Sequence, residues 1–85
     1  MSSEENEKYR CPCCGYKTLD PPPHGFEICQ VCFWQDDLVQ FDDPDYRGGP
    51  NKGVSLNEAR ANFRKFGAFS EEFIGNTRKP TEDEL

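Results

Sequence analysis

Cys11-Pro12-Cys13-Cys14-Gly15 and Cys29-Gln30-Val31-Cys32 are the two stretches that decide the fold of this chain. Each contains a C-x-x-C pair, and 14 residues lie between the two pairs. Two residues between thiolates allow one tight turn to direct both sulfurs at a metal ion about 2.3 Å away, and a hairpin can bring two such turns together. We therefore predict one tetrahedral metal site, with four ligands: Cys11, Cys14, Cys29 and Cys32.

The chemistry of four thiolates narrows the choice of metal to zinc or iron. We predict zinc. Iron is the alternative, because residues 9–16 also look like the first knuckle of rubredoxin, an electron carrier with one iron in four thiolates. Rubredoxins place Gly after the last Cys, where this chain has Phe33, so the second turn is expected to differ from the first. A closed four-thiolate site leaves no open position for substrate, so we predict a structural role and no enzyme activity.

Two other side chains are alternative ligands. Replacing Cys14 by Cys13 would leave a strained C-x-C spacing, so Cys13 is expected to pack in the core or remain a spare thiol. His24 could complete a three-Cys site, but a solvated loop histidine is the simpler expectation. A C-x-x-C pair is also a redox motif in thioredoxin-like folds, which need a βαβ pattern that this chain lacks.

The composition shows why such a site is needed. Of 85 residues, 34% are hydrophobic, and seven Phe, three Tyr and one Trp form much of that set. A core of this size rarely supplies more than about 3–5 kcal/mol, so a further stabilising element such as disulfides, a metal or a partner is expected. We predict a single domain over residues 9–75, preceded by a disordered leader at 1–8 and followed by an acidic tail at 76–85.

Charge and cysteine usage suggest the surroundings of the protein. The formal net charge is −6, which disfavours non-specific binding to nucleic acid or to an anionic membrane and favours protein partners. A nucleic-acid-binding zinc ribbon stays as the third alternative. The first ten residues contain no apolar signal region, no stretch is long enough to span a membrane, and five cysteines is an odd count. We therefore expect a cytosolic protein with reduced cysteines.

The pattern along the chain predicts a small α+β fold with zinc-ribbon or rubredoxin-like hairpin knuckles and one C-terminal amphipathic helix. Residues 16–19, 26–28 and 38–41 are predicted strands, the first two paired as a hairpin with a cysteine pair at each base. Asp36 and Asp37 form a polar turn before the third. Residues 42–53 read as a long structureless connection that offers a partner-binding surface.

The most strongly indicated element is a helix over residues 56–66. Ser55 followed by Glu58 makes a capping box, and Gly67 stands where a left-handed residue would end the helix. Apolar residues recur at helical spacing between them, so this face is expected to pack on the cysteine hairpin. Residues 70–75 predict one further short helical turn.

Four separated segments, residues 9–16, 26–34 with Asp36 and Asp37, 43–49 and 54–60, together resemble the bacterial CPCC family of cysteine-rich proteins. The resemblance extends over about residues 9–79 and implies a small domain of zinc-ribbon type, without implying a substrate. Family members often have Pro at the position of Gln30 and Glu at that of Gln35. Neither difference affects a predicted ligand.

Overall fold

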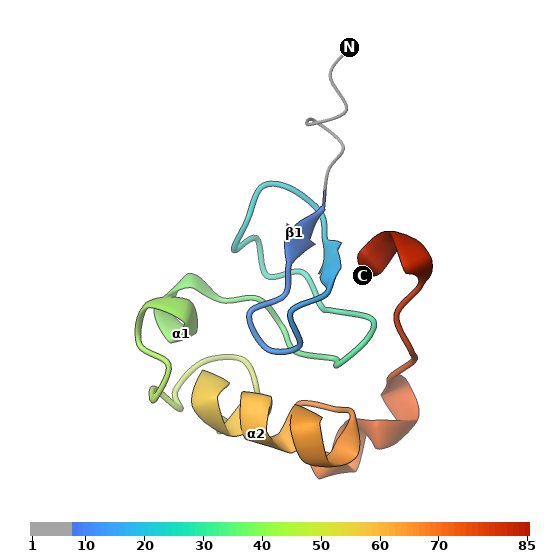
Figure 1. The fold of residues 1–85 in the computed structure, drawn as a ribbon. Coiled ribbons are helices and arrows are strands. Elements are labelled where there is room, and N and C mark those ends of the chain that lie inside the picture. Colours follow the sequence, from blue (N-terminus) through green and yellow to red (C-terminus); the bar gives the residue numbers. More distant parts are fainter. Residues whose placement is uncertain (1–7) are drawn as a thin grey trace.

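A computed structural model describes residues 8–85 and confirms a small α+β fold. The elements, in order, are β1 (Tyr9–Arg10), β2 (Lys17–Leu19), α1 (Leu38–Asp42), α2 (Leu56–Phe66) and two 3-10 helices, η2 (Glu71–Asn76) and η3 (Glu82–Glu84). Figure 1 shows the β1–β2 hairpin above α2, with α1 to one side and the C-terminal segment to the other. The predicted leader, residues 1–8, lies outside the described residues except for Lys8, whose ammonium pairs with Asp20 at 2.8 Å.

The strand pairing differs from the prediction. β1 pairs antiparallel with β2, and Ile28 forms an isolated antiparallel bridge with Gln35. The predicted hairpin between residues 16–19 and 26–28 is therefore wrong. Each C-x-x-C turn closes its own small hairpin with the residues that flank it, because those residues reach the nearest free backbone partners at the lowest cost in loop closure.

The third predicted strand, residues 38–41, is the helix α1. Asp37 has an extended backbone, and its carboxylate accepts a hydrogen bond from Gln40 N at 3.0 Å, which caps the helix at its start. Only Gln40 is buried within α1, whereas Leu38, Val39 and Phe41 are exposed. The β-branched and aromatic residues of this segment favour a strand. The cap by Asp37 and the burial of the Gln40 side chain stabilise a helix instead.

The connection after α1 is ordered by two buried amides. Gln40 Nε2 donates to Tyr46 O at 2.7 Å and to Val54 O at 2.9 Å, while Gln40 Oε1 accepts from Asn51 Nδ2 at 2.8 Å. A Cβ at Gly49 would overlap the Gln40 amide, so only glycine allows this close approach. The connection that was predicted to be structureless is therefore ordered around buried amide groups whose hydrogen bonds are formed.

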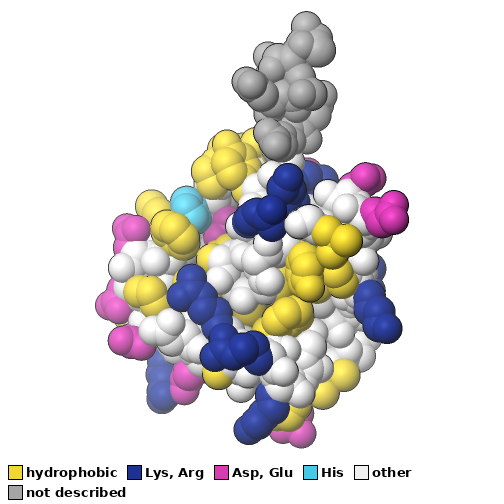
Figure 2. Space-filling view, in the orientation of Figure 1, with side chains coloured by type: hydrophobic (Ala, Val, Ile, Leu, Met, Phe, Trp, Pro, Cys, Tyr) yellow, Lys and Arg dark blue, Asp and Glu magenta, His cyan; other side chains and the backbone are white. Residues whose placement is uncertain are grey.

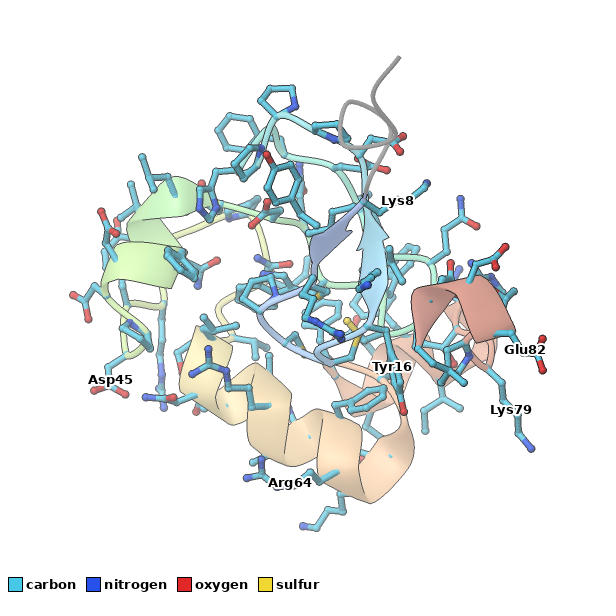
Figure 3. All side chains as sticks on the ribbon, turned by 45° about the horizontal axis from the view of Figure 1, so that its top comes forward. Lys8, Tyr16, Asp45, Arg64, Lys79 and Glu82 are labelled. Atoms are coloured by element: carbon cyan, nitrogen blue, oxygen red, sulfur yellow. The ribbon has the colours of Figure 1, made fainter. Side chains whose placement is uncertain are left out.

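The predicted helix over residues 56–66 is confirmed as α2. Ser55 and Glu58 form the capping box, and Gly67 ends the helix with φ 77° and donates to Phe63 O. Leu56 and Ala59 are fully buried in the same cluster as the cysteines, so α2 packs on the knuckles as expected. Figure 3 shows Arg64 on the outer side of α2.

The C-terminal quarter of the chain also packs on this core. Phe69 stacks on Phe73 with ring centroids 5.2 Å apart, and Phe73 lies 5.2 Å from the ring of Phe33. Residues 71–76 form η2, close to the predicted helical turn. Beyond it, Arg78 pairs with Glu84 at 2.8 Å, and η3 lies against β2.

Candidate metal centre

The four predicted ligands come together at one point. The Sγ atoms of Cys11, Cys14, Cys29 and Cys32 all lie within 4.8 Å of one another. Two contacts across the pairs are shorter, 3.6 Å between Cys11 and Cys32 and 3.7 Å between Cys14 and Cys29. A tetrahedron with metal–sulfur bonds of about 2.3 Å has edges of about 3.8 Å. The cluster therefore has the size and the donor set to hold a metal ion.

The two knuckles have the same backbone hydrogen bonds. In the first, Gly15 N donates to Cys11 O at 2.8 Å and Cys11 N to Tyr16 O at 2.9 Å. In the second, Phe33 N donates to Cys29 O at 2.8 Å and Cys29 N to Trp34 O at 2.8 Å. The repeat thus extends beyond the cysteines to the flanking residues, which the sequence did not reveal.

The expectation that the second turn would differ is wrong. Phe33 has φ 72° and occupies the left-handed region, as Gly15 does at φ 83°. An aromatic side chain rarely adopts this conformation, which costs on the order of 1–2 kcal/mol. The packing of Phe33 against Phe73 helps to hold it there.

Each knuckle is fixed from outside by the C-terminal half of the chain. Arg60 Nε of α2 donates to Pro12 O at 2.8 Å, within the first C-x-x-C turn. Phe69 N donates to Cys32 O at 2.9 Å, at the end of the second. The helical half of the fold therefore orients both turns toward the same centre.

Burial and contacts between the thiols shift the pKa values of the clustered cysteines. Cys11, Cys29 and Cys32 are buried, and Cys14 is partly exposed. Hydrogen bonding with Cys11 and Cys14 is the main cause that lowers the pKa of Cys29, while contact with neighbouring thiols, together with burial, raises the pKa of Cys11 and of Cys32. The Cys29 thiol thus ionises in preference to its neighbours. All four thiols ionise together only when a cation balances their negative charge.

A hydroxyl supports the favoured thiolate. Thr18 Oγ1 donates to Cys29 Sγ at 3.0 Å, and Cys32 N approaches the same sulfur at 3.5 Å. Thr18 is only 4% exposed, so water competes little for this bond. Sequence reasoning missed Thr18 because its position depends on the β1–β2 hairpin and not on spacing from a cysteine. Hydrogen bonds of this kind orient ligands and tune the metal.

Neither alternative ligand belongs to the cluster. Cys13 is buried and packs in the hydrophobic core, as expected, and it is not one of the four clustered cysteines. His24 is a partly buried residue, and its Nδ1 lies 3.2 Å from Asp36 Oδ1. Its backbone N donates to Asp36 Oδ2 at 2.6 Å. Asp36 is therefore more than the polar turn that the sequence predicted.

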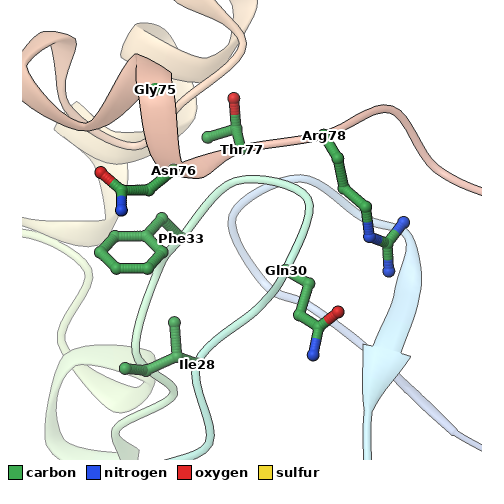
Figure 4. A pocket seen from close by; sticks show the side chains of 7 residues that line it. All are labelled: Ile28, Gln30, Phe33, Gly75, Asn76, Thr77 and Arg78. Carbon is green, nitrogen blue, oxygen red and sulfur yellow. The ribbon is translucent and has the colours of Figure 1, made fainter.

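A hollow of about 500 Å³ lies beside the second knuckle. Figure 4 shows Ile28 and Phe33 on one side of it and Gln30 and Arg78 on the other. The Arg78 guanidinium is already paired with Glu84, and none of the four clustered thiols lines the hollow. Nothing in this lining supplies a nucleophile next to a base.

Fold and site define a small cysteine-rich α+β domain with four cysteines placed to bind a metal. The chain belongs to the Cysteine-rich CPCC family, whose model matches residues 9–84. No curated protein matches the chain. Among the residues that the structure describes, no helix has the length and apolar character to cross a membrane.

Proposed function

We propose that the protein is a zinc-binding domain of zinc-ribbon type, in which Cys11, Cys14, Cys29 and Cys32 hold one structural zinc ion. The observation that carries this proposal is the cluster of four Sγ atoms within 4.8 Å, three of them on buried residues. Zinc in such a site is a folding cofactor and contributes on the order of 10 kcal/mol. That exceeds what the small aromatic core supplies.

The proposed role is interaction with protein partners and not catalysis. Four thiolates fill the tetrahedral coordination of zinc, so substrate has no position on the metal. Four thiolates and one divalent ion add about −2 to an already acidic chain, which disfavours nucleic acid further. Because the cysteine count is odd and a four-Cys metal site needs reduced thiols, we place the protein in the cytosol, where thiols stay reduced.

The metal is tested by elemental analysis of the purified protein. We expect about one zinc per chain, and the Cys29→Ser variant should lose both the metal and the folded state. Cys13→Ser is the matched control, because it removes a buried thiol outside the cluster and should retain zinc. A metal-free, folded wild-type protein would refute the proposal.

Iron in the same site is the second candidate. The likeness of residues 9–16 to the first knuckle of rubredoxin favours it, and tetrahedral sulfur accepts iron as well as zinc. A visible absorption spectrum of protein purified with and without oxygen separates the two metals. Zinc gives a colourless protein, and bound iron would turn the function toward electron transfer.

A further inference from the structure

The helix α1 exposes its apolar residues and buries its one amide side chain. Leu38, Val39 and Phe41 are 50%, 55% and 44% exposed, whereas Gln40 is fully buried. A short surface helix normally turns its apolar side chains to the core. The orientation of α1 is set by Gln40, whose amide satisfies three groups of the following loop and so fixes which residues face water.

The apolar area continues onto the loop before the second knuckle. The ring of His24 lies 4.6 Å from that of Phe41, and the hydrogen bonds of His24 to the buried Asp36 hold it there. Figure 2 shows hydrophobic side chains on either side of the histidine. We define the α1 surface by its members: His24, Leu38, Val39 and Phe41.

The edge of the α1 surface is acidic. Residues 36–46 contain five Asp and neither Lys nor Arg. Three of these, Asp42, Asp43 and Asp45, are exposed where α1 ends and the next loop begins. Figure 2 shows acidic side chains along the margin of the molecule beside this hydrophobic area. An exposed apolar area with acidic side chains at its edge is typical of a binding site.

We propose that the α1 surface binds a cationic amphipathic segment of a partner protein, with apolar side chains against Leu38, Val39 and Phe41 and Lys or Arg beside the aspartates. This inference rests on the proposed role as a protein-interaction domain and names its surface and the chemistry of its partner. Charge complementarity selects the occupant. A second copy of the chain would bring two acidic rims together, and an anionic membrane would meet the same repulsion.

The test uses zinc-loaded, isotope-labelled full-length protein and a synthetic amphipathic helical peptide of leucine and lysine. We expect salt-sensitive binding, with NMR shift changes concentrated at His24 and in residues 36–46. A Leu38→Gln/Val39→Gln variant should bind about tenfold more weakly or worse. The matched control is Tyr9→Gln/Ile74→Gln, which removes two hydrophobic side chains of similar exposure, 43% and 45%, outside the α1 surface.

Equal binding by wild type and the α1 variant, or shift changes centred elsewhere, would overturn the inference. So would equal binding of a peptide of leucine and glutamate, or dimerisation of the free protein that the α1 variant abolishes. Zinc content shows that each variant is folded. Cross-linking in the native host separates this inference from the proposed function: partners retained by the α1 variant refute the surface alone, and no partner for the wild type refutes the interaction role.

Discussion

Gly15 and Phe33 occupy equivalent positions in the two knuckles, each with a left-handed backbone and each donating its N–H to the carbonyl of the first cysteine of its pair at 2.8 Å. One position uses the residue that adopts this conformation freely, and the other uses an aromatic residue that does not. The second knuckle is therefore conformationally strained where the first is relaxed, and side-chain packing compensates for the strain.

We expect Gly15→Ala to lower the free energy of unfolding by about 1 kcal/mol. A Cβ at Gly15 meets no atom within 4 Å, so the loss reports backbone conformation alone. At the second position, Phe33→Gly should be more stable than Phe33→Ala by a similar amount, because both lose the ring and only glycine relieves the strain. Chemical denaturation at a fixed excess of zinc measures both. Equal stability of the two Phe33 variants would show that the strain argument is incorrect.

We expect Thr18→Val to weaken zinc binding by about tenfold, because the isosteric side chain removes the hydrogen bond to Cys29 Sγ and leaves the packing intact. Competition with a chelator at constant pH measures the affinity. Thr18→Ser keeps the hydroxyl and serves as the control, with affinity closer to that of wild type. The same zinc affinity in Thr18→Val and wild type would rule out a role for this hydroxyl.

We expect Gln40→Leu to destabilise the protein by about 2 kcal/mol or more, because it leaves buried partners in the following loop without hydrogen bonds. Urea denaturation of the zinc-loaded protein measures the loss. Gln30→Leu is the control, since Gln30 is exposed and the substitution should change stability little. Hydrogen exchange should also show faster exchange across residues 43–54 in Gln40→Leu. If both variants unfold at the same denaturant concentration, the amide network does not stabilise the fold.

The C-terminal segment should respond to acid through Glu84. Hydrogen bonds from Arg78 and from Thr81 N lower the pKa of Glu84 to about 2. A carboxyl whose pKa is lowered by folding contributes stability that is fully present above its ordinary value of about 4.5 and is lost as pH falls toward about 2. We expect NMR titration to find Glu84 ionised at pH 4.5. In Arg78→Gln, its midpoint should move up toward the ordinary value, and an unchanged midpoint would contradict the assignment.

The features that could be predicted from the sequence depend on residues that lie close together in the chain. The C-x-x-C spacing gave the four cysteines that the structure brings together, and Ser55, Glu58 and Gly67 gave both ends of α2. These signals depend on neighbouring residues, so they hold wherever the segment lies in the fold. The resemblance of four segments likewise led to the family that the comparison confirms.

Tertiary structure determined the features that depend on contacts between residues far apart in the chain. Residues 38–41 have the composition of a strand, but the burial of the Gln40 amide against Tyr46 O and Val54 O favours a helix and turns Leu38 and Val39 outward. Phe33 repeats the turn of Gly15 because its packing against Phe73, a residue 40 positions later in the chain, supports a conformation that local preference opposes. Local propensities amount to about 1 kcal/mol or less per residue, so a few buried hydrogen bonds and ring contacts are enough to override them.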